Sequence, residues 1–448
     1  MTTGAPAAVK TTASSRMPVM VSIVLANLVA SMDTTIANTT MPVITEELGG
    51  FELYAWSFAS YMIMSTVVSP VAGRISDLFG RKKIFAVGII LFLLGSMLCG
   101  FSNSMLQLVI YRAVQGIGAG VMMPFPAIIA GDLFPVEKRG KIQAFFTAMW
   151  GLSAILAPML GAMFVEYANW RWIFFINIPI CIVSVALLYF YKEVYQPKKS
   201  KVDLLGAFIF AVGVSLLLLT TIVESNVYVY ALLGVVLMGL FVAYEKRHES
   251  PIVPLSLLKN PPIAWMIVNS FLACASLFGA SNYIPLFLQK ESYSLFISGV
   301  ALLGMSFGWM AMAVPAGKWI VKWGYGRLLI IGNIFLVLSG VMLLFLSEGT
   351  GFWYASFAMF VQGLAFGMIA TVSVIGSQQL VKPHEKGIST SLQLFSRNIG
   401  TAIGVTIMGA FLVKTTDFYL GISNMFLYGF IVSLFALASS FMIKAKHT

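Results

Sequence analysis

The chain has 448 residues, of which 59% are hydrophobic and only 10% are charged. A water-soluble domain carries about 25% charged residues, so this composition excludes an ordinary globular protein in solution. The formal net charge of +11 would suit either nucleic acid or a membrane surface as a partner, and the positions of the charges decide between them.

Apolar stretches follow one another along the whole chain, each near the roughly 20 residues that a helix needs to cross a bilayer. In chain order we predict fourteen spans, at 17–41, 53–73, 84–101, 105–130, 142–164, 171–192, 204–223, 226–244, 263–289, 296–317, 327–347, 351–380, 387–413 and 420–444. Each must be helical, because a lone spanning segment satisfies its backbone hydrogen bonds only internally. The alternative is twelve spans, if the pair within 204–244 does not cross. The sequence predicts an all-α integral membrane protein.

Lysine and arginine concentrate in alternate loops between these stretches and in the two terminal segments. The intervening loops hold only Arg171, Lys290 and Lys414. This positive-inside bias predicts that both termini lie in the cytoplasm, which requires an even number of crossings. The positive charge therefore faces the bilayer and the cytoplasm, and we expect no nucleic-acid partner. Residues 1–16 are polar, and we interpret them as a disordered cytoplasmic tail ahead of an uncleaved first helix.

Two halves of the chain resemble each other at a nearly constant offset. Residues 113–120 are echoed by 360–367, and residues 137–140 by 384–387, both at an offset of 247. Residues 72–74 with Gly80 are echoed by 316–318 with Gly324, at an offset of 244. The repeat predicts two six-helix bundles in parallel orientation, 17–192 and 263–448. Between them, 193–262 is a basic linker with two inserted helices. The three cysteines, Cys99, Cys181 and Cys274, fall in apolar stretches, so we expect no disulfide framework.

Several motifs carry a resemblance to a known family. Residues 73–83, from Gly73-Arg74 to Lys82-Lys83, resemble the signature of the major facilitator superfamily between helices 2 and 3. Residues 108–118 are similar to the helix-4 signature of that family. Residues 151–162 resemble its helix-5 antiporter signature, with Ala157 and Ala162 where the pattern prefers glycine.

Two further segments resemble one branch of the superfamily, the fourteen-helix drug:proton antiporters. They are 32–38, which reads Met-Asp-Thr-Thr-Ile-Ala-Asn, and 170–179, which reads Trp-Arg-Trp-Ile-Phe-Phe-Ile-Asn-Ile-Pro. The resemblance implies a major facilitator fold with two six-helix bundles and two inserted helices. It also implies a transporter of the bacterial inner membrane that works as a monomer, without a cofactor, on the proton gradient.

The turn at 73–83 contains the candidate conformational latch: Gly73, Asp77, Gly80 and Arg81. The glycines allow a tight turn, and Asp77 can accept charge-assisted hydrogen bonds from Arg81 or from a helix N-terminus. The resemblance implies a latch that holds the cytoplasmic side closed. The alternative is a solvated basic turn that only sets topology.

Asp33 is the one carboxylate well inside an apolar stretch. An aspartate at a helix centre costs about 2.5–3.5 kcal/mol on insertion scales, so it must face protein or water. Arg112 lies at a similar depth in its own stretch, so we expect the two to pair and to couple proton movement to transport. The alternatives are an aspartate held by Thr34 or Asn38, and an inert ion pair.

Arg397 lies in the thirteenth stretch, which offers no acidic partner. It is a candidate contact for substrate or another anion, a snorkelling residue, or a structural one. Helix packing or hinge positions are expected at Gly116, Gly151, Pro158 and Gly161.

Three classes of function remain after these observations. The first is a proton-driven exporter of lipophilic, cationic or zwitterionic compounds, and the second an exporter or flippase of an endogenous amphiphile or organic anion. The third is a membrane sensor, which would normally have a sizeable soluble domain. No Walker-type loop occurs, so an ATP-driven pump is disfavoured, and we expect no enzyme activity and no metal site.

Overall fold

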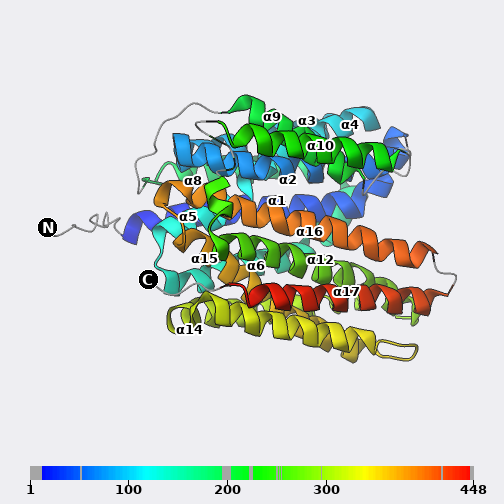
Figure 1. Cartoon of the computed structure of the whole chain (residues 1–448). Coiled ribbons are helices and arrows are strands. Elements are labelled where there is room, and N and C mark those ends of the chain that lie inside the picture. The colour runs from blue at the N-terminus through cyan, green and yellow to red at the C-terminus, as the bar shows by residue number, and fades with distance from the viewer. Residues whose placement is uncertain are drawn as a thin grey trace.

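The computed structural model describes residues 13–50, 53–193, 203–220, 226–248, 251, 253, 255–293, 295–414 and 417–443. Within these residues the regular secondary structure is helical, and the long helices lie side by side with roughly parallel axes (Figure 1). Most of the predicted N-terminal tail and most of the basic linker fall outside the described residues.

The helices follow the apolar stretches of the sequence. The first half contains α1 (Ala13–Leu48), α2 (Tyr54–Phe79), α3 (Arg81–Gly100), α4 (Met105–Met122), α5 (Phe125–Leu133), α6 (Val136–Tyr167), α7 (Trp172–Phe175) and α8 (Asn177–Leu188). The insert contains α9 (Leu204–Leu219), α10 (Val227–Glu245) and α11 (Leu255–Leu258). The second half contains α12 (Pro261–Lys290), α13 (Leu295–Val300), α14 (Leu303–Leu344), α15 (Phe352–Gln379), the 3₁₀ helix η2 (Pro383–Glu385), α16 (Lys386–Lys414) and α17 (Phe418–Ser440).

Helical structure covers each of the predicted stretches, but several boundaries differ from the prediction. The stretch 105–130 is divided between α4 and α5, because Pro124 and Pro126 cannot donate backbone hydrogen bonds. The stretch 171–192 is divided between α7 and α8. The stretch 296–317 begins in α13 and continues in α14, which also contains 327–347 and has non-helical backbone at Gly324. By length and composition alone, seven helices in the described part of the chain are apolar enough to cross a membrane.

The repeat found in the sequence is visible in the backbone. Gly80, between α2 and α3, has a φ of 102°, and its counterpart Gly324, inside α14, has a φ of 75°. Both values lie in the left-handed region, which glycine adopts without steric cost. A proline precedes each turn within the helix, Pro70 in α2 and Pro315 in α14. The two halves therefore make the same sharp turn at the same place.

Apolar packing gives each half its own core. Buried residues of the first half, among them Phe85, Phe92 and Phe125, form one large cluster, and a second cluster surrounds Met41 and Phe174. In the second half one large cluster joins residues of α12 and α14–α17. Since α1 begins and α17 ends at the same end of the molecule, we call that end the terminal face (Figure 1).

The inserted pair lies on the outside of the seam between the halves. Phe210 of α9 packs on Phe241 of α10, with 5.2 Å between ring centroids, and on Phe395 of α16 at 5.3 Å. The same cluster includes Ile63 and Val67 of α2. α9 therefore contacts a helix of each half, while α10 presents most of its apolar side chains outward, as expected for a surface bathed in lipid.

This packing predicts that Phe210→Ala destabilises the protein. Removing a buried phenylalanine side chain costs about 3–5 kcal/mol in soluble cores, so the melting temperature in detergent should fall by several degrees. Leu232→Ala is the matched control, because Leu232 on α10 is 65% exposed and should leave the melting temperature unchanged. Equal effects of the two substitutions would show that α9 does not hold the seam together.

Candidate functional site

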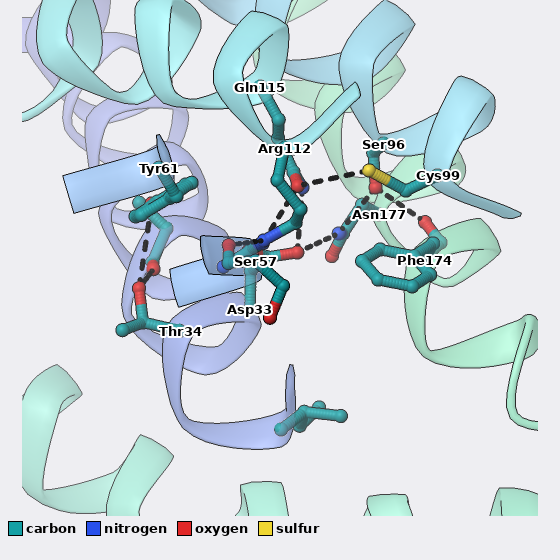
Figure 2. A network of polar contacts seen from close by, with 12 residues as sticks. Asp33, Thr34, Ser57, Tyr61, Ser96, Cys99, Arg112, Gln115, Phe174 and Asn177 are labelled. Carbon is teal, nitrogen blue, oxygen red and sulfur yellow. Dashed lines mark hydrogen bonds and ion pairs between the residues drawn. The ribbon is translucent and has the colours of Figure 1, made fainter. Parts of the chain in front are cut away.

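A buried polar network surrounds Asp33 in the middle of α1. The Nη1 atom of Arg112, from α4, lies 2.6 Å from Asp33 Oδ2. The side-chain amides of Gln115 and Asn177 donate to the other carboxylate oxygen, Oδ1, at 2.7 and 3.2 Å. Figure 2 shows these side chains converging from α1, α4 and α8. Both oxygens of the carboxylate are therefore occupied by donors from neighbouring helices.

The network is closed to solvent on the side of the ion pair. Asp33 is 2% exposed and Arg112 is 1% exposed. The Arg112 guanidinium also lies 4.3 Å from the ring centroid of Tyr61, on α2, where a cation–π contact forms (Figure 2). At an effective dielectric constant of about 20, the attraction between the unit charges of Asp33 and Arg112 is worth a few kcal/mol.

The contact between Asp33 and Arg112 is the one expected from their matched depth. Of the two alternatives named for Asp33, Thr34 donates to the backbone oxygen of Ala30 instead. The side chain of Asn38 lies outside the described residues, so that alternative is untested. The role of Asp33 and Arg112 in moving protons stays a prediction.

Sequence reasoning missed Gln115 and Asn177 as ligands of the carboxylate. Gln115 lies three residues after Arg112 and so shares its helix face, which was a usable signal. Asn177 gave no such signal, because its distance from Asp33 along the chain hides the contact. The Ser96 hydroxyl positions Asn177 by accepting a hydrogen bond from its side-chain amide at 2.9 Å. The same hydroxyl donates to the Phe174 carbonyl oxygen, also at 2.9 Å.

The predicted latch residues lie at the terminal face, between the two halves. Asp77, near the end of α2, accepts hydrogen bonds from the backbone N–H groups of Gly387 and Ile388 at 3.0 and 2.9 Å. These groups belong to the first turn of α16, where the helix dipole favours a negative charge. The structure thus places a carboxylate of one half on a helix N-terminus of the other.

Arg81 extends this contact along the terminal face. It pairs with Asp77 at 3.3 Å and with Asp132 of α5, and it donates to the carbonyl oxygen of Pro383 at 3.3 Å. Lys386 lies 3.9 Å from Asp132 across the same seam. Burial, reinforced by the charges of Arg139 and Arg81, lowers the pKa of Lys386 to about 8. Lys386 is therefore mostly charged at neutral pH and able to hold the seam.

Glycines let the two halves approach closely at two related points. A Cβ added to Gly387 would lie 2.5 Å from the carbonyl oxygen of Gly73. A Cβ added to Gly317 would lie 2.5 Å from the Cα atom of Gly140. Gly73 and Gly317 are counterparts in the repeat, and so are Gly140 and Gly387, so the two contacts are related by the pseudo-symmetry of the halves.

The predicted hinge and packing residues are not gathered in one place. An added Cβ at Gly116 would lie 2.6 Å from the Tyr61 carbonyl oxygen, so this glycine sets the approach of α2 and α4. Gly161 is buried on α6. The side-chain environments of Gly151 and Pro158 lie outside the described residues, and their role stays a prediction.

A cavity of about 340 Å³ lies between the halves, and Arg397 is one of its walls. Its lining is mainly apolar and comes from both halves: Asn27, Thr34, Tyr61, Met62, Ser65, Met123, Pro126, Ala127, Gln143, Phe146, Trp150, Trp309, Val374, Leu394, Arg397, Asn398 and Thr401. Thr34 and Tyr61 connect the cavity to the ion pair, because Thr34 follows Asp33 on α1 and the Tyr61 ring covers Arg112.

The family follows from comparison with known proteins. A sequence model described as the Major Facilitator Superfamily matches residues 23–405. The chain belongs to this superfamily. The resemblance noted in the motifs is confirmed, and the chain is a multi-pass membrane transporter rather than an enzyme.

Two similar proteins of Bacillus subtilis (strain 168) have names that refer to multidrug transport or multidrug resistance. The multidrug transporter protein MdtP is 31% identical over 410 residues, which cover 89% of this chain and 75% of MdtP. Multidrug resistance protein 3 is 32% identical over 412 residues, which cover 89% of this chain and 80% of that protein. Two relatives of this chain thus carry names that refer to multidrug transport or resistance.

Solved structures confirm the major facilitator fold. The human organic anion transporter MFSD10 superposes with a TM-score of 0.70 at 16% identity, covering 94% of this chain and 100% of that one. The proton:xylose symporter XylE superposes with a TM-score of 0.66 at 17% identity, covering 94% of this chain and 95% of that one. At these identities the likeness concerns the fold alone.

The latch geometry predicts that Gly387→Ala opens the terminal face, because the added methyl group has no room beside Gly73 and Asp77. With spin labels on Lys83 and Lys382, exposed residues of opposite halves, the distance distribution should shift to longer values. Asp77→Asn should shift it in the same direction, because the charge-assisted bonds are lost.

Gly239→Ala is the matched control for this measurement. Gly239 lies on α10 with nothing within 4 Å of an added Cβ, so the label distances should not change. A wild-type distance distribution in both Gly387→Ala and Asp77→Asn would reduce the 73–83 turn to a determinant of topology.

Proposed function

We propose that this protein is a proton-coupled multidrug exporter that exchanges protons for lipophilic compounds by alternating access. In this proposal it crosses the inner membrane of a bacterium fourteen times, with the terminal face in the cytoplasm. It belongs to the drug:proton antiporter branch, works as a monomer and needs no cofactor besides the proton gradient. The motifs and the Bacillus relatives support this assignment.

The observation that carries proton coupling is the buried pair of Asp33 and Arg112. The Asp33 carboxylate is shielded from water and paired with one cation. Loss of either charge leaves the other buried without a partner, which destabilises this arrangement of the helices. When Asp33 takes up a proton, the Coulomb attraction to Arg112 disappears, and the helices that carry the two residues can separate. If the two conformations of the transporter have similar free energies, the loss of this one charge contact shifts the population from one conformation to the other.

The cavity supplies a route from the ion pair to the substrate. Tyr61 lies between them, with its ring over Arg112 and its side chain in the cavity wall. Its hydroxyl is 3.5 Å from Thr34 Oγ1, on the residue next to Asp33 (Figure 2). A substrate that moves Tyr61 therefore changes the surroundings of Arg112, so that proton and substrate influence each other.

The contacts at the terminal face support one conformational state within this proposal. Asp77 and the two glycine contacts hold the halves together on that side of the cavity. With the terminal face in the cytoplasm, this is the arrangement expected of a transporter closed towards the cytoplasm. Release of the latch would open the cavity to cytoplasmic substrate.

A second candidate function is the export or flipping of an endogenous amphiphile or organic anion. Arg397 favours it, because it places a positive charge in the cavity wall, and none of the described residues of that wall is acidic. Transport assays with cationic, neutral and anionic amphiphiles under an imposed pH gradient separate the two candidates.

The proton-coupling proposal predicts that Asp33→Asn abolishes pH-driven efflux in proteoliposomes, with a loss of at least tenfold in rate. Asn cannot release a proton, so the cycle loses its coupling step. Because the substitution leaves Arg112 charged and buried without its partner, it also lowers stability. The double variant Asp33→Asn/Arg112→Gln removes both charges. It leaves no unpaired charge in the interior, so it should be more stable than the single variant and allows proton coupling to be tested without Asp33.

Glu166→Gln is the control, because Glu166 is an exposed carboxylate on α6. It should transport like the wild type. Wild-type proton coupling in the double variant would remove Asp33 from the mechanism.

The topology proposal predicts opposite labelling at two exposed or half-buried loop positions. Cysteine at Glu348 should react with an impermeant maleimide from outside the cell, and cysteine at His384 should not. The native Cys99, Cys181 and Cys274 are buried and should give no background. Reaction of position 384 from outside would reverse the assigned orientation.

A further inference from the structure

The cavity between the halves has an electrostatic character that the multidrug assignment does not state. Arg397 is the only charged residue in its described lining. The nearby Asp33 does not balance this charge, because it is already paired with Arg112 behind Tyr61. A ligand in this cavity therefore meets a net positive wall.

Arg397 lies deep within the bundle. It is eleven residues beyond Lys386, where α16 begins, which corresponds to roughly 16 Å of helix. Its guanidinium carbon is 4.6 Å from the ring centroid of Phe366, and the Trp309 ring meets the same phenylalanine edge-on at 4.5 Å. Phe366 thus supports both side chains at the cavity wall.

The unpartnered polar atoms of the lining point to the same kind of ligand. Among the described residues of the cavity lining, three buried nitrogen atoms have no hydrogen-bond partner: Asn27 Nδ2, Trp309 Nε1 and Arg397 Nε. All three are donors, and each belongs to a residue of the cavity wall. A buried donor without an acceptor costs about 1–3 kcal/mol, so a ligand that brings acceptor oxygens gains that energy on binding.

We propose that this cavity binds amphiphiles that carry an acidic group, such as a carboxylate or sulfonate, on an apolar aromatic body. Arg397 and the N–H groups of Trp309 and Asn27 receive the acidic group, and Met62, Phe146 and Trp150 cover the body. Zwitterions fit through their acidic end, whereas purely cationic amphiphiles are disfavoured. This differs from the sequence-based expectation of cationic or zwitterionic substrates in disfavouring pure cations, and it rests on the proposed transport function.

Three probes with one body and different charges test the proposal. They are 4-(1-naphthyl)butyrate, the corresponding alcohol and the corresponding primary amine. Binding is measured by equilibrium dialysis to protein in nanodiscs, with empty nanodiscs of the same lipid subtracted. Wild-type protein should bind the acid at least tenfold more tightly than the amine, with the alcohol between them. An amine that binds as tightly as the acid would overturn the proposal.

Arg397→Gln should weaken binding of the acid at least tenfold and change binding of the alcohol by less than twofold. Arg397→Lys keeps the charge and should retain the preference for the acid. Unchanged binding of the alcohol shows that the glutamine variant is folded. Trp309→Phe should weaken the acid severalfold and leave the amine unchanged, because an ammonium group accepts no hydrogen bond. A preference for the acid that survives in Arg397→Gln would exclude Arg397 as its receptor.

Arg171→Gln is the matched control. Arg171 also stacks on an aromatic ring, with its guanidinium 4.4 Å from the Trp170 centroid, but it lies outside the cavity. Its removal should not change the order of the three probes. The binding assay uses no proton gradient, so loss of coupling in Asp33 variants leaves this inference standing. Binding of the acid without any transport would instead overturn only the proposed function.

Discussion

The buried ion pair between Asp33 and Arg112 constrains the architecture of the first half. Two charges in a low-dielectric interior are tolerated only when their remaining hydrogen-bonding groups are also satisfied. Gln115 and Asn177 meet this need for Asp33, and the Tyr61 ring covers Arg112. Helices α1, α2, α4 and α8 must therefore keep their relative positions as long as both charges are present. A change of protonation acts on four helices at once.

The two halves share a scaffold but not a chemistry. The turn at Gly80 and its counterpart at Gly324 have the same left-handed backbone, yet Val321 stands where the first half has Asp77. Likewise, Met359 stands where the first half has Arg112. The first half thus holds the buried pair of Asp33 and Arg112 and the carboxylate of Asp77, while the second half contributes the helix N-terminus that Asp77 contacts and the arginine in the cavity wall. The proposed function would therefore place the proton site and the charge of the substrate site on different halves.

The sequence predicted the helices and the repeat well, because both depend on local patterns of apolar residues, glycines and charges. It also predicted the pairing of Asp33 with Arg112, since a lone carboxylate and a lone arginine at matching depth had few other partners. It did not predict Asn177 as a ligand of Asp33, and although it offered a helix N-terminus as a partner of Asp77, it did not predict that this would be the N-terminus of α16 at Gly387. Those contacts join segments distant along the chain, and amides or backbone groups carry no charge pattern that marks them. The cavity could not be predicted from the sequence either, because its walls come from helices of both halves, which are far apart along the chain.

The glycine contacts determine what must break when the two halves separate at the terminal face. At Gly73 with Gly387, and at Gly140 with Gly317, backbone lies against backbone, and the side chains of Ser391 and Asp77 flank the first of these contacts. Separating such surfaces breaks fewer apolar contacts than separating a seam of large side chains would. Hydrogen bonds that cross between the halves there include those that Asp77 accepts from α16, the one from Arg81 to the Pro383 carbonyl and the one from Arg139 to Gln378. In the proposed cycle the closed and open states would then differ by only a few kcal/mol, which is the scale of one charge pair gained or lost in the interior.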